Sequence, residues 1–148
     1  GRRFAVGERV AAMGAGRALH AETVVVPQNL AVPLPDAVSF ADAAFVALGA
    51  TALQAARRGE VSFGEEVGVV GLGMVGQLVA RVCRIAGARV WATDPLPRRE
   101  AAARAGGVHA AASLQQIDAP GWDAAFLCVG GEATAALEGV DGLDLPRI

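Results

Sequence analysis

The stretch Val67–Asp94, VGVVGLGMVGQLVARVCRIAGARVWATD, decides how this chain folds. It begins with a short apolar run, continues through three glycines spaced G-x-G-x-x-G, and then carries a segment with helical periodicity. A second apolar run follows and ends on an acid. This order predicts a strand, a tight turn that can hold phosphate, a helix, a second strand and a carboxylate placed to bind ribose.

The segment between the two apolar runs has the periodicity of a buried helix. Its apolar residues from Val75 to Ala86 recur at intervals of three and four positions, as one face of an amphipathic helix requires. Gln77, Arg81 and Arg84 fall on the other side, so we expect them to face solvent. Two strands joined by a helix of this length must run parallel, with a right-handed crossover.

The sequence downstream repeats the alternation of helix and strand. We expect a helix over 98–105, a short strand over 108–111 and an apolar strand over 124–129. Ser113 is expected to begin one more helical turn, and a last helix is expected from Glu132. The pattern predicts an α/β fold with a partial, parallel, Rossmann-type sheet of about four strands. Numbered along the chain, these strands should lie in the order 3-2-1-4.

Upstream of this unit the chain is poorer in helix. Residues 9–13 and the β-branched run 18–26 are predicted to form short strands. Prolines between positions 27 and 35 indicate a loop. A segment with so few strands cannot form a stable domain by itself. We therefore expect it to pack against another part of the protein.

Two helices are predicted between that segment and the glycine-rich stretch. The hydroxyl of Ser39 can cap the first, and Asp42 stands three residues later at capping-box spacing. Gly49 is expected to separate it from a second helix over residues 50–58. Gly59 is expected to end that helix as a left-handed cap.

The three glycines of the motif have separate tasks. Gly71 permits the tight turn, Gly73 lets a pyrophosphate approach the backbone, and Gly76 brings the helix close to the strand. Backbone N–H groups at the start of the helix, including those of Met74 and Val75, would hold a diphosphate together with the positive end of the helix dipole. The motif therefore predicts a dinucleotide as ligand.

Asp94 lies 18 residues after Gly76 and ends the second strand. A carboxylate at this place can accept hydrogen bonds from the hydroxyl groups of the adenosine ribose. A 2′-phosphate would meet a like charge there, so NAD is favoured over NADP. The structural alternative is a solvated turn aspartate before Pro95. Arg98 and Arg99 leave a further choice, because a guanidinium could rest on the ribose and adenine or recruit a phosphate.

Composition and residue spacing exclude several classes of partner. With 13 basic and 15 acidic residues the net charge is −2, so neither nucleic acid nor membrane is an expected partner. The apolar stretch 43–56 is too short to span a bilayer. Cys83 and Cys128 stand in apolar settings and are expected to be reduced packing residues of a cytoplasmic protein. His20 and His109 lie far apart and fit no metal-binding spacing, so no metal site is predicted.

Several segments in a fixed order carry a resemblance to a known family. They are VGERVAAM (6–13), HAETVVVPQNLAVPLPDAVSFADAA (20–44), GATALQAA (49–56), SFGEEVGVVGLGMVGQLVARVCRIAGARVWATD (62–94) and DAAFLCVGG (123–131). Together they make the chain resemble the medium-chain dehydrogenase/reductases, the family of zinc-type alcohol and polyol dehydrogenases.

The resemblance implies a partial Rossmann dinucleotide-binding domain over residues 40–148, preceded over residues 1–39 by a remnant of a GroES-like catalytic domain. It also implies hydride transfer between NAD(P) and a small alcohol or carbonyl substrate. By position, the glycines match the family's pyrophosphate turn and Asp94 matches its ribose acid. The remaining matches are Arg99 beside the adenosine, Thr51 near the nicotinamide, and Cys128 to Gly130 in the loop under the cofactor.

The chain also departs from the family pattern. The segments that supply the catalytic zinc ligands, the structural zinc lobe and the second half of the Rossmann fold are absent. We therefore expect an incomplete or shortened NAD(P)-dependent oxidoreductase with no zinc site, whose catalytic residues and activity as an enzyme stay open. The alternative is a non-catalytic dinucleotide-binding or interaction module. In both cases the strand over 124–129 leaves an apolar sheet edge, so self-association or pairing with a partner chain is expected.

Overall fold

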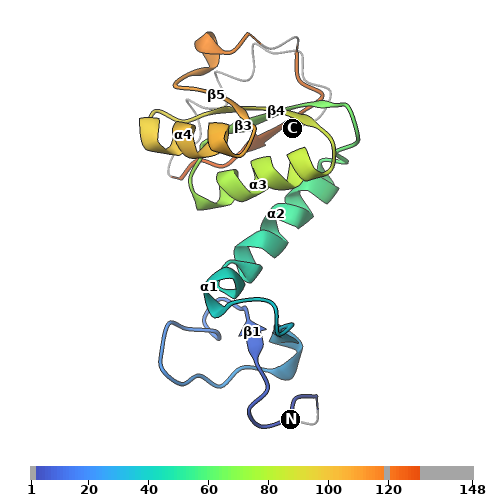
Figure 1. Ribbon diagram of the computed structural model, residues 1–148, viewed down its shortest axis with the longest axis vertical. Coiled ribbons are helices and arrows are strands. Elements are labelled where there is room, and N and C mark those ends of the chain that lie inside the picture. Colours follow the sequence, from blue (N-terminus) through green and yellow to red (C-terminus); the bar gives the residue numbers. More distant parts are fainter. Residues whose placement is uncertain (1–2, 119–120, 131–148) are drawn as a thin grey trace. The chain divides into compact units, whose positions relative to one another are not determined.

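The computed structural model describes residues 3–118 and 121–130, which fall into two units that divide between Ala47 and Leu48 (Figure 1). The first unit contains β1 (Val10–Ala12), the 3-10 helix η1 (Gln28–Leu30), β2 (Ala31–Pro33) and α1 (Phe40–Ala43). The helix α2 (Val46–Arg58) lies across the division. The second unit contains β3 (Glu66–Val70), α3 (Met74–Ile85), β4 (Arg89–Thr93), α4 (Pro97–Ala105), β5 (His109–Ala111), the 3-10 helix η2 (Leu114–Gln116) and β6 (Ala124–Leu127). The helix expected from Glu132 lies outside the described residues.

In the first unit β1 pairs with β2 as an antiparallel ribbon, in the register Val10 to Pro33. This confirms a strand within 9–13, but the strand predicted over 18–26 is wrong, because those residues form bends and extended loop. The second strand lies instead within the stretch predicted as a proline-rich loop. A β-branched run becomes a strand only when another backbone segment pairs with it, and here β1 pairs with β2.

Ser39 caps α1 as predicted, since its Oγ accepts a hydrogen bond from the N–H of Asp42 at 3.0 Å. The expected break at Gly49 is wrong. The chain leaves helical geometry earlier, at residues 44–45, and α2 then runs through Gly49 to Arg58. One glycine inside a helix costs about 1 kcal/mol relative to alanine, which is too little to interrupt a helix that packs on a core.

The end of α2 also differs from expectation. Glu60, not Gly59, takes the left-handed conformation, with φ +52°. The N–H of Val61 donates to the carbonyl oxygen of Ala56 at 3.2 Å and closes the last turn. At Gly59 a Cβ would lie 2.7 Å from the Phe126 ring, so a larger residue there would force this ring to shift.

Two glycine-to-alanine changes isolate the effect of backbone conformation on stability. A Cβ on Gly49 or on Gly64 would meet no atom within 4 Å, but Gly49 is helical whereas Gly64 has φ +83°. Gly49→Ala is therefore expected to raise the free energy of unfolding by about 1 kcal/mol. Gly64→Ala should lower it by about 1 kcal/mol, since alanine disfavours positive φ. Urea denaturation measures both, and equal effects would contradict the prediction.

The second unit is built on a parallel sheet with the strand order β5-β4-β3-β6. Val67 lies between Val90 of β4 and Ala124 of β6, and Trp91 lies beside His109 of β5. Numbered along the chain this is the order 3-2-1-4, so the predicted α/β fold class is confirmed. Among the described residues β6 forms one edge of the sheet, and self-association through that edge stays a prediction.

The main core lies between one face of this sheet and the helices. Its fully buried side chains include Val67, Val69, Val79, Cys83 and Val90. A smaller cluster on Val70, Trp122 and Ala125 belongs to alternate positions of the strands and therefore to the other face. No helix in the described part of the chain is long and apolar enough to cross a bilayer.

Candidate functional site

The glycine turn joins β3 to α3 at the carboxyl edge of the parallel sheet. Gly71 has φ +93°, and its N–H donates to the carbonyl oxygen of Thr93 at 2.8 Å. A Cβ on Gly71 would lie 2.8 Å from the carbonyl oxygen of Cys128, so both conformation and space require glycine. The N–H of Cys128 donates to Val70 at 2.7 Å. The turn is therefore held between the ends of β4 and β6.

The other two glycines have opposite surroundings. A Cβ on Gly76 would overlap the carbonyl oxygen of Gly71 and lie 3.2 Å from the Cβ of Cys128. Helix α3 thus sits directly on the turn. A Cβ on Gly73 would meet no atom within 4 Å, and no side chain caps the first turn of α3. The first turn of α3, with its N–H groups and the positive end of the helix dipole, therefore lies beside open space that an anion can occupy.

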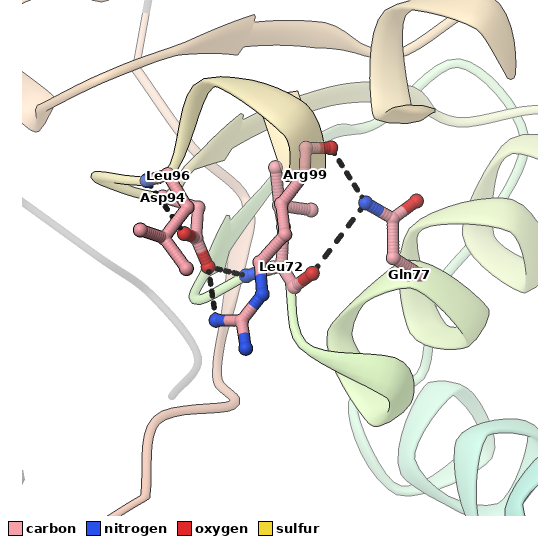
Figure 2. A network of polar contacts seen from close by, with 5 residues as sticks. All are labelled: Leu72, Gln77, Asp94, Leu96 and Arg99. Atoms are coloured by element: carbon pink, nitrogen blue, oxygen red, sulfur yellow. Dashed lines mark hydrogen bonds and ion pairs between the residues drawn. The ribbon is translucent and has the colours of Figure 1, made fainter. Parts of the chain in front are cut away.

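Asp94 lies beside this turn and is only 2% exposed, so it is not a solvated turn residue. Its Oδ2 accepts a hydrogen bond from the N–H of Leu72 at 2.8 Å, and its Oδ1 accepts one from the N–H of Leu96 at 2.9 Å (Figure 2). The guanidinium of Arg99 lies 3.2 Å from Oδ2. The acid predicted to bind ribose is therefore joined directly to the glycine turn.

These contacts keep Asp94 ionised. Burial alone would raise the pKa of this carboxyl, but the N–H groups of Leu96 and Leu72 and the guanidinium of Arg99 together hold the pKa of Asp94 below its ordinary value. A fixed negative charge thus stands at the end of β4 at neutral pH.

Gln77 links the turn to α4. Its Nε2 donates to the carbonyl oxygen of Arg99 at 2.7 Å and lies 3.5 Å from that of Leu72 (Figure 2). Its Oε1 accepts a hydrogen bond from Arg81 at 2.6 Å, and Arg81 also reaches the carbonyl oxygen of Ala102 at 3.2 Å. The prediction that Gln77 and Arg81 face solvent is therefore wrong, because α4 lies against this side of α3.

The sequence carried one signal for this contact. Gln77 and Arg81 stand four residues apart, a spacing at which helical side chains interact, and Gln77 directly follows the last glycine of the motif. No pattern pointed to the N–H of Leu96 as a partner of Asp94. Arg84 is exposed, as predicted.

The remaining predicted site residues have different surroundings. Met74 is 58% exposed in the first turn of α3, whereas Val75 is half-buried and packs on the core. Thr51 is exposed on α2, and Gly130 is exposed two residues beyond Cys128.

The two cysteines are packing residues. Cys83 is fully buried, and desolvation, with a smaller contribution from neighbouring Cys128, raises the pKa of its thiol to about 11. Burial also raises the pKa of Cys128, which lies under the turn. Both thiols are therefore protonated at neutral pH. Within residues 3–118 and 121–130, no three His, Cys, Asp or Glu side chains are grouped so that they could hold a metal ion.

Comparison with protein families identifies this unit as a cofactor domain. Residues 39–119 match the family described as D-isomer specific 2-hydroxyacid dehydrogenase, NAD binding domain. The matched residues run from the Ser39 cap through the glycine turn and Asp94 and past η2. The agreement therefore concerns the cofactor-binding unit.

Individual proteins similar to this chain are dehydrogenases and oxidoreductases. An uncharacterised zinc-type alcohol dehydrogenase-like protein of Escherichia coli is 42% identical over 91 residues, which are 60% of this chain and 26% of that protein. The structure of 2R,3R-butanediol dehydrogenase from Bacillus subtilis is 26% identical with a TM-score of 0.68, over 84% of this chain and 40% of that one. The structure of the quinone oxidoreductase of Pseudomonas syringae is 27% identical with a TM-score of 0.78, over 95% of this chain and 47% of that one.

This chain thus spans between 26% and 47% of the length of these three relatives. The chain belongs to the family of the D-isomer specific 2-hydroxyacid dehydrogenase NAD binding domain, and the relatives confirm its resemblance to the zinc-type alcohol dehydrogenase-like, medium-chain dehydrogenase/reductases.

Proposed function

We propose that this chain binds NAD at the glycine turn, as the cofactor-binding part of an oxidoreductase that transfers a hydride between NAD and an alcohol or carbonyl. The observation that carries the proposal is the buried, ionised Asp94, hydrogen-bonded to a glycine turn whose helix start is open. The family resemblance supports residues 40–148 as the cofactor domain. The proposed cofactor residues are Gly71, Gly73, Met74, Val75, Gly76, Asp94, Arg99, Thr51, Cys128 and Gly130.

The pyrophosphate would lie at the start of α3. Gly73 leaves open space beside the backbone, and the N–H groups of Met74 and Val75 belong to a first turn that no side chain caps. Two phosphate charges there would face the positive helix end. The turn and α3 would thus hold the cofactor without a charged side chain.

The adenosine ribose would lie at Asp94. A carboxylate offers about four acceptor positions, and Leu72, Leu96 and Arg99 already occupy three of them. Two ribose hydroxyls can bind only if one partner withdraws. Arg99 is that partner, because its side chain is 41% exposed and the other two donors are backbone groups. The carboxylate would repel a 2′-phosphate, which favours NAD over NADP.

The bound nicotinamide would supply hydride exchange. The residues of this chain would contribute binding and orientation: the turn places the pyrophosphate, Asp94 places the ribose, and Cys128 supports the turn from β6. The substrate class, an alcohol or carbonyl, comes from the family. The alternative of a non-catalytic module is not favoured, since the matched relatives are dehydrogenases and oxidoreductases.

Titration with NADH tests the proposal. The emission of the two tryptophans, Trp91 and Trp122, overlaps the absorption of NADH, so binding should transfer excitation to the cofactor. We expect a dissociation constant in the micromolar range, and one at least about tenfold higher for NADPH, a difference of about 1.4 kcal/mol. Trp91→Phe would assign the signal to one donor.

Three outcomes would change the proposal. Absence of NADH binding at millimolar concentration would defeat it. Equal or tighter binding of NADPH would mean that Arg99 recruits the 2′-phosphate in spite of Asp94. Binding without turnover across a panel of alcohols would favour a dinucleotide-binding module.

A further inference from the structure

A closed ring of contacts surrounds the backbone of Leu72, the residue between the first two glycines (Figure 2). Its N–H donates to Asp94 at 2.8 Å, and its carbonyl oxygen lies 3.5 Å from the Nε2 of Gln77. The same Nε2 donates to the carbonyl oxygen of Arg99 at 2.7 Å, and the Arg99 guanidinium returns to Asp94 at 3.2 Å. The N–H of Leu72 thus joins the glycine turn to Asp94 directly, and Gln77 adds a second link between them by way of Arg99.

The orientation of the Gln77 amide is determined by its neighbours. The carbonyl oxygens of Leu72 and Arg99 can only accept hydrogen bonds, so they require the NH2 group. The guanidinium of Arg81 can only donate, so it requires Oε1. An amide satisfies all three neighbours at once, whereas a carboxylate or an apolar side chain cannot.

This contact also orients a peptide group of the turn. The carbonyl of Leu72 and the N–H of Gly73 belong to one planar trans peptide, so they point in opposite directions. When the carbonyl faces Gln77, the N–H of Gly73 faces away from Gln77. The second hydrogen bond, to Arg99, ties the same side chain to the first turn of α4.

We propose that Gln77 is a positioning residue for the dinucleotide, because it fixes the glycine turn relative to the first turn of α4. It thereby sets the spacing between the N–H groups that hold the pyrophosphate and the carboxylate that holds the ribose. The inference rests on the proposed function. It predicts that Gln77 matters for ligands that bridge both positions and not for ligands that occupy one.

Two variants of the full chain test this role. Gln77→Met replaces the amide with a side chain of similar size that makes none of its hydrogen bonds. Gln77→Glu keeps an acceptor for Arg81 but places an oxygen atom against the carbonyl oxygens of Leu72 and Arg99. Gln54→Glu is the matched control, since Gln54 is exposed on α2. NADH, which bridges both positions, is titrated by tryptophan energy transfer, and adenosine, which has no phosphate, by ligand-observed NMR.

We expect both Gln77 variants to bind NADH at least about tenfold more weakly, a difference of about 1.4 kcal/mol. Their affinity for adenosine should stay within about twofold of wild type. Gln54→Glu should bind both NADH and adenosine within about twofold of wild type. NADH affinity within twofold of wild type in both variants would overturn the inference. An equal loss for adenosine, or unfolding of both variants, would overturn it too, because Gln77 would then serve the adenosine site or the fold. Failure of the wild type to bind NADH would instead defeat the proposed function.

Discussion

Gly76→Ala is expected to abolish NADH binding and to lower the free energy of unfolding by about 3 kcal/mol. The new Cβ would overlap the carbonyl oxygen of Gly71, which belongs to the turn itself, and would press on Cys128. Neither the turn nor β6 can move away without breaking the hydrogen bonds that Gly71 and Cys128 make to β4 and β3. The helix would therefore separate from the turn, and the site would lose its shape.

Gly73→Ala is the matched control for this effect. The backbone there has φ −64° and ψ −171°, which alanine adopts readily, and the Cβ would enter open space. We expect the free energy of unfolding to rise by about 0.5 kcal/mol, because alanine restricts the unfolded chain. NADH affinity should fall at least about tenfold, because the methyl group would occupy the space that the pyrophosphate needs.

Urea denaturation and NADH titration of both variants separate the two roles. The expected pattern is loss of stability and of binding in Gly76→Ala, but loss of binding alone in Gly73→Ala. Wild-type NADH affinity in Gly73→Ala would show that the pyrophosphate does not lie against this glycine. A stability loss in Gly73→Ala as large as that in Gly76→Ala would show that the turn needs both glycines for folding.

Asp94→Asn is expected to lower the free energy of unfolding by about 2 kcal/mol at neutral pH. An amide oxygen can accept from Leu72 or from Leu96, but its NH2 group would then face the remaining N–H. The ion pair with Arg99 adds little to this value, because the arginine is 41% exposed and solvent screens the pair. NADH affinity should fall at least about tenfold, and the preference over NADPH should shrink, since the negative charge is removed.

The pH dependence gives a second test of Asp94. Its pKa is lower in the folded chain than the ordinary value of 3.8, so the folded state favours the ionised form. The resulting stability is fully present above about pH 4 and is lost as the pH falls through the folded pKa. Denaturation at pH 7, 5 and 3 should show the difference between wild type and Asp94→Asn shrinking only at pH 3. Asp118→Asn, at an exposed aspartate, should change stability by less than about 0.5 kcal/mol at each pH.

Much of the second unit could be predicted from short-range patterns. The period of apolar residues located α3, and the strand β4 has the predicted bounds Arg89–Thr93. The strand order also followed, because helical crossovers between parallel strands leave few alternatives. In the first unit the same reasoning placed β1 but missed β2, since a short strand exists only where a second backbone segment pairs with it.

Local sequence patterns were sufficient to predict the strand, turn, helix and strand around the glycine motif and to place Asp94 at the end of β4. Periodicity and the conformational freedom of glycine act within a few residues, so a linear pattern records them. The hydrogen bonds of Asp94 with Leu72, Leu96 and Arg99, and the contact of Gln77 with α4 instead of solvent, could be seen only in the folded chain. Those contacts depend on which elements pack together, because a polar side chain becomes a buried hydrogen-bonding group only when another element covers it.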